Sequence, residues 1–112
     1  MKSFRLEVYG RVQGVNFRKD VKAYADKAGL KGFVANREDG SVLAVVRCKK
    51  DELNDFIFWL KESPGFSSVK GVKVREVSGI RGLDGFRILR RDGLLKDKGK
   101  SFGNLCRNFW GG

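Results

Sequence analysis

The sequence contains no histidine, and this absence excludes more functions than any other feature of its composition. Without histidine the chain has no imidazole general base, no Ser-His or Cys-His catalytic pair and no histidine metal ligand. Cysteine is also scarce, since only Cys48 and Cys106 are present, far apart and in no C-x-x-C motif. Two such thiols make neither a disulfide framework nor a zinc site, and they fit a reducing compartment.

Long apolar runs and acidic residues are the other shortages. No run approaches the roughly 20 apolar residues that span a bilayer, and the N-terminus continues into a strand pattern rather than a signal peptide. We therefore expect a cytoplasmic protein that is a monomer and does not bind membranes. The 13 acidic residues are outnumbered by 24 Lys and Arg, which gives a net charge of +11. Such a charge attracts anions of every kind, including nucleic acid and phosphorylated metabolites, and does not choose among them.

The apolar pattern that is present indicates one folded domain. The 112 residues are 41% hydrophobic and include 9 Phe, which favours a globule over disorder. The patterns follow the order β-α-β-β-α-β with a short last strand, typical of the ferredoxin-like α+β fold (split βαβ), an antiparallel sheet with two helices on one face. A break from period two between Val74 and Val77 predicts a β-bulge. The predicted elements cover residues 3–10, 18–28, 30–36, 42–48, 51–60, 69–77 and 86–88.

Residues 91–112 do not continue this pattern. Five glycines interrupt any helix there, and several lysines make the segment polar. Phe102, Leu105, Phe109 and Trp110 are too apolar for a simple linker. We expect a domain over residues 1–90, followed by a basic, Gly-rich extension outside the core.

The stretch from Gly10 to Arg18 joins the first strand to the first helix and has the properties of an anion site. Gly10 and Gly14 can adopt backbone conformations closed to other residues. Successive N–H groups in such a turn, together with the unpaired N–H groups of a helix start, form an anion-binding hollow. Arg18 adds a planar fork of donors suited to a phosphate. In the split βαβ plan the first two strands run parallel with the third between them, so Asn36 ends roughly 10 Å from this loop.

Two motifs carry a resemblance to a known family. The run Gly10-Arg11-Val12-Gln13-Gly14-Val15-Asn16-Phe17-Arg18 closely resembles the acylphosphatase signature G-x-V-Q-G-V-x-F-R. Residues 29–42 resemble the second motif of that family, G-L-x-G-[WF]-V-x-N-x-x-D-G-x-V. The likeness covers residues 4–90 in strand order and spacing.

The resemblance implies an enzyme that hydrolyses the carboxyl–phosphate bond of small-molecule acyl phosphates with no metal or cofactor. It implies catalytic roles for Arg18, which would bind the phosphate, and for Asn36, which would position the attacking water. An acyl phosphate has a good leaving group, so the lack of a strong general base fits this reaction. The main-chain amides that the resemblance assigns to the phosphate belong to Arg11, Val12, Gln13, Gly14, Val15, Asn16 and Phe17.

A non-enzymatic alternative starts from the same element order. Basic βαββαβ modules also bind RNA or other polyanions. RNA-recognition domains carry the run K/R-G-F/Y-G/A-F-V-x-F/Y on the third strand, whereas residues 41–46 contain no aromatic residue. We therefore expect no specific nucleic-acid partner, although the charge permits non-specific contact. Arg37 follows Asn36 directly and is expected to add charge near the site.

Overall fold

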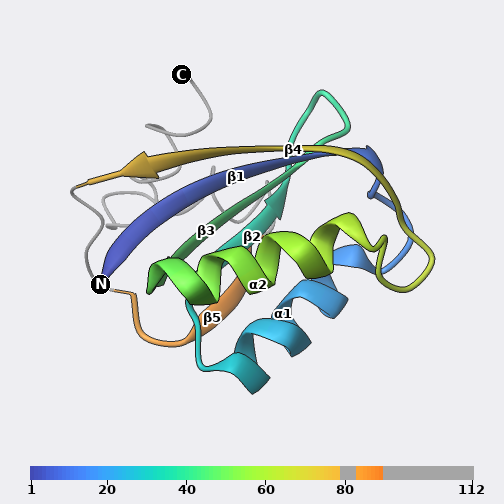
Figure 1. The fold of residues 1–112 in the computed structure, drawn as a ribbon. Helices are drawn as coiled ribbons and strands as arrows, with labels where there is room; N and C mark the ends of the chain where they lie inside the picture. The colour runs from blue at the N-terminus through green and yellow to red at the C-terminus, as the bar shows by residue number, and fades with distance from the viewer. Residues whose placement is uncertain (79–82, 90–112) are drawn as a thin grey trace.

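The computed structural model describes residues 1–78 and 83–89, and the predicted extension over residues 91–112 lies outside the described residues. Five strands and two helices follow one another in the predicted order, with a short strand after the fourth (Figure 1). They are β1 (Lys2–Arg11), α1 (Phe17–Ala28), β2 (Lys31–Asn36), β3 (Val42–Cys48), α2 (Lys50–Lys61), β4 (Ser68–Val77) and β5 (Phe86–Leu89).

The strands form one sheet in the order β4-β1-β3-β2-β5. β1 and β2 each pair antiparallel with β3, which lies between them, so the predicted parallel course of β1 and β2 is confirmed. β5 pairs parallel with β2 at the edge opposite β4, so the five-stranded sheet is mixed and not wholly antiparallel as predicted. β1 and β2 consequently end at the same edge of the sheet.

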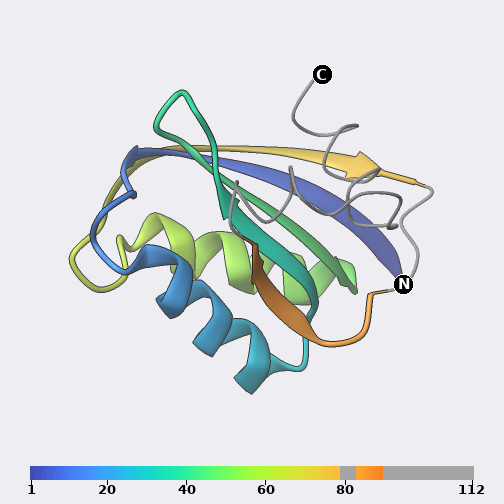
Figure 2. The same cartoon turned by 180° about the vertical axis from the view of Figure 1, so that it is seen from behind.

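Both helices cover the same face of the sheet, which completes the predicted ferredoxin-like α+β arrangement (Figures 1 and 2). α1 buries Phe17, Val21 and Ala25 at a spacing of four residues, as an amphipathic helix does. Tyr24 of α1 stacks on Trp59 of α2 with ring centroids 4.5 Å apart. No helix among the described residues is long and apolar enough to cross a membrane. The sheet and α2 contribute further buried side chains, including Leu6, Val8, Val34, Val42, Ala44, Val46, Leu53, Phe56 and Leu60.

The opposite face of the sheet also carries buried apolar side chains. Phe33, Leu43 and Val45 form a second cluster there, and Val77 and Leu89 pack against it. Because this sheet buries apolar side chains on both faces, a spacing of three residues along a strand can mean a change of face. The bulge predicted between Val74 and Val77 is wrong for this reason, since Val77 faces the second cluster.

The β-bulge in β4 lies at Lys70. The register between β1 and β4 is regular from Ser3 to Tyr9 and shifts between Tyr9 and Gly10. Gly10 has φ 125, and a Cβ atom there would lie 2.2 Å from the Ser68 carbonyl oxygen. The close approach of the two strands therefore requires glycine at the first position of the signature run.

Candidate active site

The loop between β1 and α1 has the backbone of an anion cradle. Gly14 (φ 76) and Asn16 (φ 61) both adopt the left-handed conformation, the kind of local geometry that turns successive N–H groups toward one point. The Asp20 N–H donates to the Asn16 carbonyl over 3.1 Å, which starts the intrahelical bonding of α1. The Asn16 side chain makes no capping hydrogen bond. The first N–H groups of α1 therefore have no side-chain cap competing with a ligand.

A pocket of about 450 Å³ lies against this loop. It brings Arg18 and Asn36 together, although they come from different elements, α1 and β2. The volume is within the usual range for small-molecule sites. Side chains or main chain from eight residues line it: Val12, Gly14, Asn16, Phe17, Arg18, Lys19, Asn36 and Ile88.

Arg18 is the arginine that lines this pocket, and its side chain is half-buried in the first turn of α1. Its Nη1 donates to the Leu89 carbonyl over 3.5 Å, at the outer limit of a hydrogen bond. No carboxylate among the described residues forms an ion pair with it. A cation at a helix N-terminus opposes the helix dipole, so Arg18 and the adjoining Lys19 leave the pocket with a positive charge that a bound anion would offset.

Asn36 faces the pocket from the end of β2. Its Oδ1 atom is buried and has no hydrogen-bond partner within the described part of the chain. A buried acceptor without a donor costs on the order of 1–3 kcal/mol. A donor that reached Oδ1 would recover this cost.

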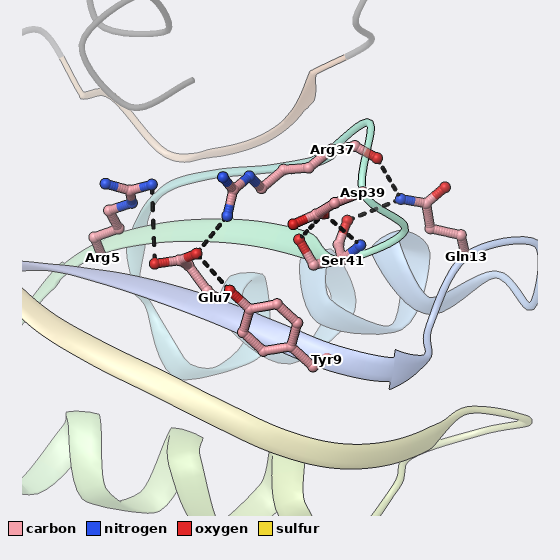
Figure 3. Close-up of polar contacts among 7 residues, drawn as sticks. All are labelled: Arg5, Glu7, Tyr9, Gln13, Arg37, Asp39 and Ser41. Atoms are coloured by element: carbon pink, nitrogen blue, oxygen red, sulfur yellow. Dashed lines mark hydrogen bonds and ion pairs between the residues drawn. The ribbon is translucent and has the colours of Figure 1, made fainter. Parts of the chain in front are cut away.

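Gln13 contacts the β2–β3 connection and does not line the pocket. Its Nε2 donates to the carbonyl oxygens of Arg37 and Ser41, each over 2.8 Å (Figure 3). These two hydrogen bonds attach the β1–α1 loop to the connection that directly follows Asn36 in the sequence. Of the other predicted phosphate-loop residues, Arg11 is exposed at the end of β1 and Val15 packs against the core, so neither lines the pocket.

Arg37 lies on the other face of the sheet, and the expectation that it adds charge near Asn36 is wrong. Its guanidinium binds the Glu7 carboxylate, which also accepts a hydrogen bond from the Tyr9 hydroxyl over 2.7 Å (Figure 3). Arg5 lies 3.9 Å from the same carboxylate. Successive side chains along a strand leave on opposite faces, so Asn36 and its neighbour Arg37 reach different surroundings.

The Glu7 carboxylate is held in its charged form. Burial alone would raise the pKa of Glu7, but the hydrogen bonds from Tyr9 and Arg37 and the charges of Arg5 and Arg37 outweigh burial and lower the pKa. The same hydrogen bond to Glu7 raises the pKa of the Tyr9 hydroxyl. This cluster therefore carries a stable ionic network, away from the pocket.

Lys19 and Ile88 line the pocket but were not predicted. Lys19 directly follows the signature run, and its position next to Arg18 in the first turn was the signal available. Ile88 belongs to β5. The short alternating pattern of this strand could not show that it pairs with β2. In the described ranges, 1–78 and 83–89, no group of three or more Cys, Asp or Glu side chains is placed to hold a metal ion. The lining offers cations, amides and apolar groups, which suits binding of an oxyanion and orientation of a neutral nucleophile.

Comparison with known proteins agrees with the motifs. The acylphosphatase family model matches residues 4–88. The acylphosphatase of Bacillus licheniformis is 40% identical over 88 residues, covering 79% of this chain and 98% of that protein. The acylphosphatase of Thiobacillus denitrificans is 39% identical over 79 residues, covering 70% of this chain and 89% of that protein. The crystal structure of the acylphosphatase from Bacillus subtilis matches with a TM-score of 0.74 at 38% identity, covering 80% of this chain and 99% of that one.

Proposed function

The chain belongs to the acylphosphatase family, and we propose that its pocket hydrolyses the carboxyl–phosphate bond of small acyl phosphates to a carboxylate and inorganic phosphate. The observation that carries this proposal is the meeting of Arg18, Asn36 and the signature loop in one pocket. An arginine, a helix start and a left-handed glycine loop suit a phosphoryl group. A carboxamide beside them suits a water.

In the proposed reaction the phosphoryl group binds to main-chain N–H groups of the signature-loop residues that line the pocket and to the Arg18 guanidinium. These loop residues are Val12, Gly14, Asn16 and Phe17. These donors are positioned before the substrate arrives, so they stabilise the charge that grows on the phosphoryl oxygens without reorganisation. Lys19 adds a second positive charge at the pocket wall. The proposal needs no metal ion, because these groups supply the positive charge.

Asn36 is proposed to orient the attacking water by accepting one of its hydrogens at Oδ1, the buried atom without a partner. The water oxygen forms a bond to phosphorus while the bond between phosphorus and the carboxyl oxygen breaks. The electron pair of the broken bond leaves with the carboxylate. The lining residues within the described part of the chain include no carboxylate that could accept a proton. We therefore assign the proton lost by the water to a phosphate oxygen of the substrate.

Hydrolysis of benzoyl phosphate in the presence of EDTA tests this proposal. We expect Arg18→Ala to lower kcat/KM by about 1,000-fold, the scale on which loss of one charged transition-state donor acts. Arg37→Ala is the matched control, because it removes the same side chain at the same edge of the sheet but outside the pocket. Its kcat/KM is expected to stay within about threefold, since the Arg37 guanidinium binds Glu7, which does not line the pocket. Wild type as inactive as Arg18→Ala, or an equal loss in Arg37→Ala, would overturn the proposal.

We further propose that the enzyme works as a monomer in the cytoplasm. All residues that line the pocket come from one chain, so the site needs no second copy. The sequence has only two cysteines, in no spacing typical of a disulfide framework, which fits a reducing compartment. Light scattering coupled to size exclusion is expected to give a mass near 12.6 kDa, and a stable dimer would contradict the proposal.

A further inference from the structure

The pocket is larger than the phosphoryl group and the water that the proposed reaction places in it. Its volume is about 450 Å³, whereas one water takes up about 30 Å³ and a phosphoryl group has only a few non-hydrogen atoms. The signature loop and Arg18 are assigned to the phosphoryl group, and Asn36 is assigned to the water. Two lining residues, Lys19 and Ile88, are left to contact the acyl part of the substrate.

Lys19 and Arg18 reach the pocket from different directions, although they are neighbours in the first turn of α1. Successive residues of an α-helix point about 100° apart, and both of these residues line the pocket. Arg18 is half-buried, and its Nη1 donates to the Leu89 carbonyl of β5 over 3.5 Å. Lys19 is exposed to solvent. The arginine therefore lies deeper in the pocket, and the lysine lies at its opening.

The Lys19 ammonium is not neutralised by the part of the chain that the structure describes. It forms no ion pair within residues 1–78 and 83–89, and none of the pocket-lining residues in these ranges is acidic. The carboxylate of the next residue, Asp20, lies against Gly65 in the connection between α2 and β4. A cation near a helix N-terminus opposes the helix dipole, so this position gives α1 no electrostatic benefit. The charge of Lys19 is available to a ligand.

We propose that the enzyme prefers acyl phosphates whose acyl group carries a carboxylate, and that Lys19 binds this carboxylate at the opening of the pocket. This inference rests on the proposed function, because it concerns the substrate of the same site. With the phosphoryl group held by the signature loop and Arg18, the acyl group is directed to the opening where Lys19 lies. Ile88, half-buried on β5, offers an apolar surface to the carbon atoms between the two charges.

A carboxylate fits Lys19 better than a second phosphate does. An ammonium is a single point charge without the planar fork of arginine, and a carboxylate also carries one charge, whereas a phosphate carries up to two. The ion pair would form at an exposed position, where such a pair changes an equilibrium constant by up to about fivefold. We therefore expect a preference of this size for carboxylated substrates and not an absolute requirement.

Hydrolysis of 4-carboxybenzoyl phosphate and of 4-carbamoylbenzoyl phosphate tests this proposal, because the two compounds have the same shape and differ by one charge. We expect wild type to hydrolyse the carboxylated compound with a kcat/KM about fivefold higher. The difference should lie mainly in KM, since the ion pair is present before and during the reaction. Lys19→Met keeps an unbranched side chain and should bring the ratio of the two kcat/KM values to about one, and Lys19→Glu should invert it. The corresponding 3-substituted pair repeats the comparison with the carboxylate in another direction.

Lys27→Met is the matched control. It removes the same charge from the last turn of α1, outside the pocket, and should leave the wild-type ratio unchanged. An increase in NaCl from about 20 to about 500 mM should bring the wild-type ratio toward one, because salt screens an exposed ion pair.

Three results would overturn this inference and leave the proposed function intact. In the first, wild type hydrolyses both members of the 4-substituted pair and of the 3-substituted pair with equal kcat/KM. In the second, Lys19→Met lowers kcat/KM by the same factor for both members of each pair, which would assign Lys19 to the phosphoryl group. In the third, Lys27→Met changes the ratio as much as Lys19→Met, which would show attraction by net charge alone. If wild type hydrolyses none of these compounds and no benzoyl phosphate, the proposed function fails and this inference fails with it.

Discussion

Asn36 and Arg37 are neighbours at the end of β2, yet they contribute to opposite sides of the sheet. On the helix side, Asn36 lines the pocket together with the signature loop, and its buried Oδ1 atom has no hydrogen-bond partner among the described residues. On the opposite face of the sheet, the Arg37 guanidinium binds Glu7, which also accepts a hydrogen bond from Tyr9 and lies 3.9 Å from Arg5. The difference teaches that polar groups reserved for a ligand and polar groups that stabilise the fold can adjoin in sequence when a strand separates them.

Among the variants that distinguish the two faces of the sheet, Asn36→Ala is expected to have the largest effect. Loss of the carboxamide should lower kcat for benzoyl phosphate by about 100-fold or more, because it removes a group proposed to orient the water. The free energy of unfolding should not fall, because Oδ1 has no hydrogen-bond partner to lose among the described residues. Steady-state kinetics and urea denaturation measure the two quantities. Asn54→Ala, on the exposed side of α2, is the control; a large loss of stability with unchanged kcat would make Asn36 a structural residue.

A smaller and mixed effect is expected from Gln13→Ala, because Gln13 links the loop to the connection that follows Asn36. Its removal takes one of two donors from the carbonyls of Arg37 and Ser41, which keep the main-chain N–H groups of Gly40 and Arg37, and this should cost about 1 kcal/mol of unfolding free energy. The displaced hairpin should also lower kcat about tenfold, since small shifts of a positioning group are costly. Gln13→Glu keeps the shape of the side chain but loses the donated hydrogen bonds. It therefore tests whether both effects depend on these bonds rather than on the bulk of the side chain. A normal kcat in both variants would show that this link does not position Asn36.

The smallest effect, confined to stability, is expected from Glu7→Gln. The pKa of Glu7 is lowered in the folded protein, so its contribution is fully present above the unfolded value of about 4.5 and is lost as pH falls through the lower folded value. The variant should be about 1–2 kcal/mol less stable at pH 7, and the gap should close toward pH 3. Urea denaturation at pH 7, 5.5, 4 and 3 follows this change, with kcat at pH 7 staying within about twofold. A gap that persists unchanged at pH 3 would contradict the ionic origin of the effect.

Most of the fold was predictable because most of its elements are long and strongly patterned. α1 repeats its buried positions every four residues, and β1 alternates from Phe4 to Val8. The convergence of the signature loop with Asn36 followed from a single topological fact, the parallel course of β1 and β2 around β3. The meeting of Arg18 and Asn36 in one pocket could therefore be expected before their positions were known.

The parts that were not predictable depend on which face or edge an element joins. Val77 looked like a bulge because apolar side chains on two faces of one sheet imitate a break in alternation. Ile88 could not be placed in the pocket because four residues of β5 do not specify their partner strand. Once Asn36 had been assigned to the pocket, alternation along the strand was enough to predict that the Arg37 side chain lies on the opposite face of the sheet.

The contact between Arg18 and Leu89 joins residues 71 positions apart. Contacts of such sequence separation form late, after the chain has closed a long loop. A growing polypeptide thus acquires its signature loop early and the β5 side of its pocket last. Turnover of an acyl phosphate would then report on docking of the final strand, so that recovery of activity during refolding should lag behind formation of the helices.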